Sequence, residues 1–283
     1  MPYIIRRRNL GKTSVREIVR HSTQGIRAFR NDQWPAGRFL DPGLVFRWGC
    51  TSDLPHPTTG VTVVNQAEAI HRVSNKRTFR EILDANDLCP PTWQAGNQAD
   101  ITYPCIVRPE THHQGRNFHV CRNAQEVGNA IVRCGQGWYA SPLINKVAEY
   151  RVFVVQGRCV CVARKYPGNP TDVAWNVARG GRFVNVRWNE WPLKAVKTSI
   201  RAFLLSGLDF GGVDVIVDPE GSCFVLEINA APSLTSPYRQ TCFAKAFDYI
   251  VEYGKEVIPL PAGRGGYTKF IHPAITENVT NAR

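Results

Sequence analysis

The segment GGVDVIVDPEGSCFVLEIN, at residues 211–229, constrains the fold of this chain more than any other part. Two apolar runs of strand-forming residues flank the turn sequence DPEG, which predicts a β-hairpin that turns at residues 218–221. Asp214 lies in the first run. Glu227 and Asn229 lie two residues apart in the second run, so strand alternation places them on one face. The hairpin therefore predicts polar side chains that converge inside a folded domain.

These three polar residues are candidate metal ligands. A carboxylate buried among apolar neighbours without a partner is costly, and a bound cation would supply that partner. Mg²⁺ prefers carboxylate and amide oxygens and keeps coordination places for water and phosphate. The alternative is a pair of acidic residues on a solvated hairpin face. The apolar surroundings favour a magnesium site formed by Asp214, Glu227 and Asn229.

Composition narrows the class of protein. With 283 residues and 43% hydrophobic content, the chain is long enough for two or three small subdomains. No apolar run approaches the roughly 20 residues that cross a bilayer, and the charged start MPYIIRRRNLGKTS does not resemble a signal peptide. We therefore expect a cytoplasmic protein without membrane association. The nine cysteines are odd in number, scattered and free of Cys-x-x-Cys pairs, which indicates reduced core residues rather than disulfides or a zinc site.

The formal net charge of +12 predicts an anionic partner. Nucleotides, acidic substrates and nucleic acid all satisfy this requirement. The arginines are spread along the whole chain, and no nucleic-acid-binding motif is present. Phosphates or anionic substrates are therefore favoured over nucleic acid as partners. The sequence GKTS at residues 11–14 has the tail of a P-loop, but Arg6 stands where the required glycine would be, so we interpret it as a helix start.

Before the carboxylate hairpin, strand and helix patterns alternate. Strands are expected at residues 3–8, 43–49, 61–65, 103–110, 118–121, 138–144, 149–156 and 158–166. Helices are expected from Thr13 or Ser14, each a plausible cap, and at residues 66–84, 123–132 and 192–206. The two strands within residues 103–121 form a hairpin with a polar tip, and those within residues 149–166 form another that turns at Gly157.

The hairpin together with the following AAPSL resembles the metal-binding signature of ATP-grasp ligases. It is most similar to the RimK-like branch, which adds amino acids to carboxyl termini. Similar motifs precede it in the family's order, namely NKRTFREILDANDLCPPTW, YPCIVRPE, YASPLI and EYRVFVV. The resemblance spans about residues 60–255. It implies an α+β ATP-grasp fold in which two α+β subdomains clasp ATP, preceded by a small, reduced α/β domain.

The implied domain organisation has four parts. Residues 1–70 would form the N-terminal domain, and residues 71–145 would form the subdomain with the phosphate-covering loop. Residues 146–260 would form the subdomain with the metal site, followed by a tail at residues 261–283.

The resemblance also implies roles for individual residues. The implied nucleotide-binding residues are Lys76, Arg108, Gly115, Ser141, Leu143, Glu149 and Asn176. Leu143 would offer its backbone N–H to adenine, because the neighbouring proline has none. Arg108 stands where the family usually has a lysine, and a planar guanidinium replaces a point charge there. The implied catalytic residues are Arg151, Lys165 and Arg179.

The implied reaction joins a carboxylate to an amine. ATP and two Mg²⁺ ions, bridged by Glu227, would serve the conversion of a small-molecule or peptide carboxylate into an acyl-phosphate. An amine acceptor would then attack to form an amide or peptide bond. Another nucleophile, such as a thiol, is an alternative acceptor. A basic nucleic-acid-binding or scaffold protein with a degenerate ATP-grasp fold is the alternative function. The cysteine-rich, methionine-poor composition also resembles ligases encoded by viruses of bacteria, which would act in the host cytoplasm.

Overall fold

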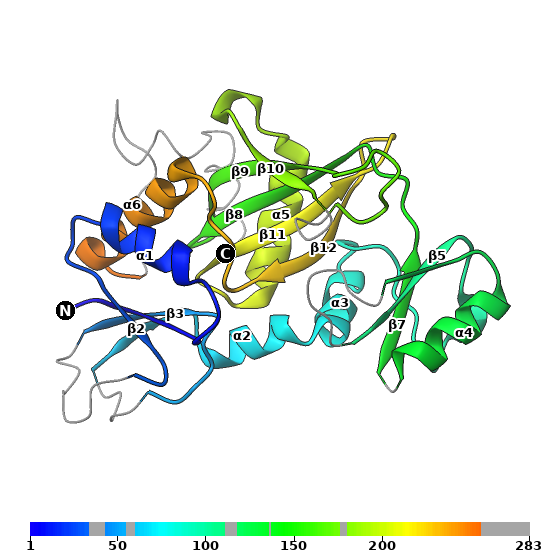
Figure 1. Cartoon of the computed structure of the whole chain (residues 1–283), viewed down its shortest axis with the longest axis horizontal. Coiled ribbons are helices and arrows are strands. Elements are labelled where there is room, and N and C mark those ends of the chain that lie inside the picture. Colours follow the sequence, from blue (N-terminus) through cyan, green and yellow to red (C-terminus); the bar gives the residue numbers. More distant parts are fainter. Residues whose placement is uncertain (34–42, 55–59, 111–117, 136, 176–179, 256–283) are drawn as a thin grey trace.

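The computed structural model describes residues 1–33, 43–54, 60–110, 118–135, 137–175 and 180–255 (Figure 1). Their strands form three sheets, one within each of the three folded units expected from the sequence. The predicted tail at residues 261–283 lies outside the described residues. No helix in the described ranges is long and apolar enough to cross a membrane.

The first sheet is parallel, with strand order β2-β1-β3-β4. Its strands are β1 (Tyr3–Arg6), β2 (Arg27–Arg30), β3 (Leu44–Trp48) and β4 (Thr62–Val64). Helix α1 (Lys12–His21) connects β1 to β2, and its first residue follows Gly11 in the left-handed region at φ 68°. The prediction that Thr13 or Ser14 caps this helix is wrong. The Ser14 hydroxyl is buried and instead accepts a hydrogen bond from the Leu234 N–H.

The helical pattern at residues 66–84 is divided into α2 (Ala67–Ser74) and α3 (Lys76–Asp84). Asn75 separates them with an extended backbone, and its side chain accepts from the Thr78 N–H to cap α3. The break turns Lys76 into the first residue of a new helix. Both helices pack on the core of the largest sheet.

The three-stranded sheet has the order β6-β5-β7 and is antiparallel. Its strands are β5 (Cys105–Pro109), β6 (His119–Cys121) and β7 (Trp138–Pro142). Helix α4 (Ala124–Cys134) covers it through Val127 and Ala130, and the Asn123 side chain caps that helix. The predicted hairpin, helix and strand of this unit are therefore confirmed.

The largest sheet is antiparallel, with strand order β10-β9-β8-β11-β12. Its strands are β8 (Ala148–Val155), β9 (Arg158–Tyr166), β10 (Arg182–Val186), β11 (Phe210–Val217) and β12 (Cys223–Asn229). Both predicted hairpins are confirmed, as is helix α5 (Leu193–Ser206). Alternation along the strands gives the sheet two apolar faces. One packs on α5, α2 and α3, and the other on α6 (Pro237–Tyr253) and α1.

The second of these cores is shared with the first sheet. Phe46 of β3 stacks on Phe247 of α6 with ring centroids 4.1 Å apart, and Trp48 lies 5.3 Å from Phe210 of β11. Figure 1 shows α1 and α6 side by side between the first and the largest sheets. The N-terminal layer is thus continuous with the ligand-binding half of the molecule. The nine cysteines are free thiols, and seven are buried, as the sequence predicted.

Candidate functional site

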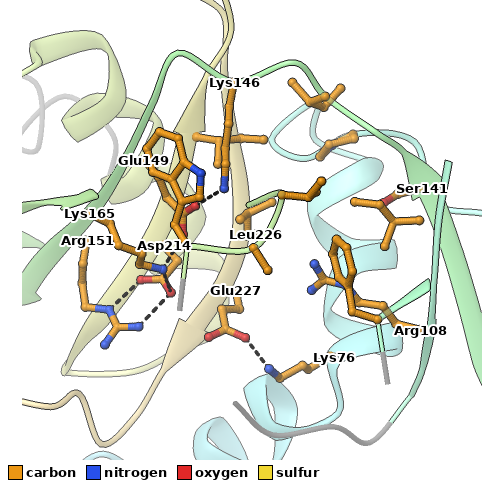
Figure 2. A pocket seen from close by; sticks show the side chains of 18 of the residues that line it. Lys76, Arg108, Ser141, Lys146, Glu149, Arg151, Lys165, Asp214, Leu226 and Glu227 are labelled. Carbon is orange, nitrogen blue, oxygen red and sulfur yellow. Dashed lines mark hydrogen bonds and ion pairs between the residues drawn. The ribbon is translucent and has the colours of Figure 1, made fainter. Parts of the chain in front are cut away.

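A cavity of about 510 Å³ lies between the three-stranded and the five-stranded sheets (Figure 2). Gly115, Asn176 and Arg179 lie outside the described residues. The other ten predicted site residues all line this cavity, and they are Lys76, Arg108, Ser141, Leu143, Glu149, Arg151, Lys165, Asp214, Glu227 and Asn229. The fold thus brings together residues that are up to 153 positions apart along the chain.

Strand register places the charges of the largest sheet next to one another. Arg151 of β8 lies directly opposite Asp214 of β11, and Glu149 lies opposite Lys165 of β9. The Arg151 guanidinium donates two hydrogen bonds to Asp214, at 2.6 and 2.7 Å. Lys165 Nζ contacts Glu149 and lies 3.2 Å from Asp214 Oδ2. These four side chains form one buried network on the face that α6 leaves uncovered.

Gly212 leaves space for this network. A Cβ atom at that position would lie 3.3 Å from Arg151 Cδ and 3.0 Å from the Pro232 Cβ. Any larger residue would push Arg151 away from Asp214. The second glycine of the GGVDV motif is therefore required by close packing.

The network stabilises its charged forms. Burial opposes ionisation of Asp214, but the charges of Arg151 and Lys165 outweigh it and hold the pKa of that carboxyl below its ordinary value. The pKa of Lys165 is raised in return, because Asp214 and Glu149 outweigh the effect of burial. Both side chains are therefore ionised at neutral pH. A mobile anion or cation entering the cavity meets fixed charges.

A β-bulge directs Glu227 into the cavity. Asp214 pairs with Glu227, but the next residue of β11, Val215, pairs with Val225, so Leu226 is the extra residue. Val225 consequently packs in the core, whereas Leu226 and Glu227 both line the cavity. Strict alternation would have placed Leu226 on the opposite face from Glu227.

Glu227 has a partner on a different element. Lys76, at the start of α3, contacts its carboxylate, as Figure 2 shows. Burial opposes ionisation, yet Lys76 and the cations of the sheet hold the pKa of Glu227 far below its usual range. The expectation of unpaired carboxylates at this hairpin is therefore wrong. Lysine and arginine side chains compensate both carboxylates, and this pairing was invisible in the local sequence.

The donor set nevertheless fits magnesium. Asn229 Nδ2 donates to Glu227 Oε1 at 3.2 Å, which leaves the Asn229 amide oxygen free to face a cation beside two carboxylates. Hard oxygen ligands of this kind suit Mg²⁺. In the described part of the chain, no group of three His, Cys, Asp or Glu residues could hold a metal ion by itself. A metal here would therefore depend on the amide and on phosphate or water oxygens.

Lys146 is a site residue that the sequence interpretation missed. Its amine contacts Glu149 and lies 4.4 Å from the centre of the Trp175 ring. Burial lowers the pKa of Lys146, although the charge of Glu149 opposes this shift. Lys146 precedes its strand in an irregular segment, so no periodic pattern marked it. The charge of Glu149 is thereby shared between two lysines.

The opposite wall of the cavity is less charged. Arg108 of β5 lies 4.7 Å from the centre of the Phe118 ring and has no carboxylate partner among the described residues. Ser141 and Leu143 also lie on this wall. The Leu143 N–H donates to the Pro104 carbonyl at 2.9 Å. It is therefore not free to donate to adenine as predicted, and Leu143 contributes its side chain to the wall.

Comparison with known proteins places this geometry. Residues 59–248 match a family model described as an ATP-grasp domain, family 3 of its clade. The "Probable alpha-L-glutamate ligase 2" of Hahella chejuensis is 26% identical over 241 residues, covering 78% of this chain and 77% of that relative.

Two solved structures share the fold. The ATP-grasp ligase PsnB, complexed with a phosphomimetic variant of its minimal precursor, Mg and ADP, superposes with a TM-score of 0.62 and 14% identity over 87% of this chain and 98% of PsnB. The D-alanine–D-alanine ligase of Bacillus anthracis, complexed with ATP, has a TM-score of 0.64 and 12% identity over 90% and 96%.

A two-lobed α+β fold with a cationic, carboxylate-bearing cavity between its sheets defines the class of nucleotide-dependent ligases. Because the family model matches more than half of the sequence, the chain belongs to the ATP-grasp family. It is an ATP-dependent carboxylate–amine ligase, and ligases of this family use ATP and magnesium. The predicted family and α+β fold are confirmed.

Proposed function

We propose that the enzyme joins an amino acid, through its amine, to a peptide or small-molecule carboxylate, by way of an acyl-phosphate. The observation that carries this proposal is the convergence of Asp214, Glu227 and Asn229 with three cations, Lys76, Arg151 and Lys165, on one cavity. The names of the relatives support an amino-acid substrate, because the first of them is called an alpha-L-glutamate ligase. PsnB, which was solved with a precursor peptide, supports a peptide as the carboxylate partner.

We assign the nucleotide to the region between Arg108 and Glu149. Apolar side chains there, including Ile106, Leu226 and Ile216, offer a floor for a base, and Glu149 offers oxygens for ribose hydroxyls. Lys76 and Arg108, which lie on different elements, would bind the phosphates by charge-assisted hydrogen bonds. Gly115 would belong to the segment that covers them.

Magnesium belongs, in this proposal, to the hairpin end of the cavity. Asp214, Glu227 and Asn229 would hold two ions, with Glu227 between them. Bound magnesium would neutralise phosphate charge and orient the terminal phosphate. Glu227 must release Lys76 when it binds metal, and the freed lysine can then turn to phosphate oxygens. The pair between Lys76 and Glu227 thus keeps both groups ionised until the ligands arrive.

Arg151 is suited to the acyl half of the reaction. Its Nε and Nη2 are fixed by Asp214, whereas its Nη1 has no partner among the residues described and can donate into the cavity. An arginine held in this way can orient the reacting carboxylate and stabilise negative charge on the tetrahedral oxygen. Lys165, Asn176 and Arg179 would surround the transferred phosphate. No covalent attachment to the enzyme is required.

The proposal is tested by release of ADP and phosphate. The purified enzyme is incubated with ATP, Mg²⁺ and a panel of amino acids, each with and without a peptide library as carboxylate donor. Mass spectrometry identifies the condensed product. We expect ADP and phosphate to appear in equal amounts and only when both partners are present. Release of pyrophosphate, or product formation without ATP, would reject the acyl-phosphate route.

A further inference from the structure

Arg239 of α6 is a buried cation without a counter-ion. Only 2% of its surface is exposed, and it forms no ion pair with a carboxylate in the described ranges. Its Nε donates to Ser236 Oγ at 2.8 Å, and its Nη2 donates to Thr235 Oγ1 at 3.1 Å. Its Nη1 is buried and has no hydrogen-bond partner among those residues. Burying a charge in this way costs free energy unless a partner is supplied.

The guanidinium of Arg239 lies behind the acyl end of the cavity. It is 5.7 Å from the centre of the Phe183 ring. Arg151 and Lys165 lie 4.9 and 5.4 Å from the same ring. Asp214 and Glu149 neutralise Arg151 and Lys165, but nothing in the described structure neutralises Arg239. Burial lowers its pKa, and the nearby charge of Arg151 lowers it further.

The hydrogen bonds of Arg239 determine what Thr235 can do. A guanidinium can only donate, so the Thr235 oxygen accepts, and the Thr235 proton must point elsewhere. Thr235 is exposed and lines the cavity, so its O–H is available to a ligand there. The neighbouring hydroxyl differs, because Ser236 Oγ lies 3.1 Å from Asn185 Oδ1 and its proton is used in that bond. Thr235 is therefore a donor made more acidic by the charge behind it.

The charge of the cavity indicates which ligand would use this donor. Six cations line it, namely Lys76, Arg80, Arg108, Lys146, Arg151 and Lys165, against three carboxylates. A simple ammonium substrate would be repelled by this excess of positive charge. An amino acid brings its own carboxylate and is neutral overall. The amine of an amino acid can therefore approach where a bare amine cannot.

We propose that Thr235, positioned by Arg239, binds the α-carboxylate of the amino acid that supplies the amine. This inference rests on the proposed function and specifies how its acceptor is recognised. Thr235 touches the substrate, and Arg239 is a positioning residue that fixes the acceptor role of the Thr235 oxygen and adds positive potential. The subsite would select amino acids over their α-amides and over amines without a carboxylate.

The test compares each amino acid with its own α-amide. Binding of the twenty amino acids and their amides is measured by calorimetry, with the full chain, Mg²⁺ and a non-hydrolysable ATP analogue. We expect the best amino acid to bind about ten- to a hundredfold more tightly than its amide, the range of a hydrogen bond to a charged group. In Thr235→Val and Arg239→Gln this ratio should fall to about one, whereas affinity for the ATP analogue should not change.

Two further variants serve as controls. Thr235→Ser keeps the hydroxyl and should keep the preference for the acid, and Thr62→Val makes the same exchange at an exposed position in the N-terminal sheet and should change nothing. A purely structural role would weaken acid and amide equally. The proposal is overturned if no amino acid binds the wild type, if the wild type does not distinguish acid from amide, or if Thr235→Val retains the preference. Because Thr235 is exposed, this variant decides the matter even if Arg239→Gln does not fold. Amino-acid binding without any ADP release would instead reject the proposed function alone.

Discussion

The five-stranded sheet and the three-stranded sheet line the same cavity but hold their charges differently. On the five-stranded sheet, Glu149, Arg151, Lys165, Asp214 and Glu227 all have partners of opposite charge. On the three-stranded sheet, Arg108 has only the face of Phe118. The first wall is organised before any ligand binds, whereas the charge of the second wall depends on the ligand for its partner.

This difference separates stability from binding. A paired, buried charge contributes to folding, because removing either partner leaves the other uncompensated. A partly exposed arginine without a carboxylate contributes little to folding and remains available to phosphate. Substitutions on the two walls should therefore affect different measurements.

The largest effect is expected from Glu227→Gln, which keeps the size of the side chain and removes its charge. Turnover of ATP at saturating Mg²⁺ should fall by about a hundredfold or more, because charge neutralisation at the transferred phosphate is lost. Glu220→Gln, in the exposed hairpin turn, is the matched control and should turn over normally. Equal rates in the two variants would contradict the assignment of the metal site.

Asp214→Asn tests the paired wall as part of the fold. It leaves Arg151 and Lys165 buried with one carboxylate fewer, so the free energy of unfolding should decrease by about 3 kcal/mol. Urea denaturation monitored by tryptophan fluorescence measures this change. Asp100→Asn, at an exposed position, should cost less than about 0.5 kcal/mol. A similar stability for both variants would show that the network does not contribute to folding.

Arg108→Ala tests the other wall. ATP affinity should weaken about tenfold, since a charge-assisted hydrogen bond is lost, and the loss should shrink at high salt. The free energy of unfolding should stay within about 0.5 kcal/mol of wild type. Calorimetry and urea denaturation give the two values. A large loss of stability with unchanged ATP affinity would reverse the proposed contrast between the walls.

The smallest expected effect is a change in acid sensitivity. The pKa values of Asp214 and Glu227 are lower in the folded protein, so the folded state binds fewer protons than the unfolded state. Their contribution is complete above the unfolded pKa values of about 4 and is lost as the pH falls below them. Between pH 5 and 3, Asp214→Asn should lose stability less steeply than wild type, by about 1 kcal/mol per pH unit. Parallel curves would contradict the shift.

The sequence predicted those parts of the site that local pattern determines. Alternation and turn residues located both long hairpins, so the relative positions of Glu149, Arg151, Asp214 and Glu227 followed from motifs within single strands. Pairing between strands was not predictable in the same way. Lys76 meets Glu227 across 151 positions, and only the packing of α3 on the largest sheet brings them together.

Elements without a clear pattern were missed. Strand β2 has the sequence RAFR and strand β10 the sequence RFVNV, and each is an edge strand with exposed positions and little apolar character. Asn75 capping α3 was also missed, because the helical pattern of residues 66–84 is continuous on both sides of it. The bulge at Leu226 has no local signal either, since it depends on the partner strand.

The aromatic contacts between the first and the largest sheets have a consequence for how this gene can be shortened or recombined. The matched family region begins at residue 59, after Phe46 and Trp48. A chain cut at that point would leave Phe210 and Phe247 without two of their ring partners and expose an apolar surface to water. A hybrid that took its first 58 residues from a relative would need rings of matching shape at both positions. The N-terminal layer is thus inherited together with the catalytic domain, as a single unit.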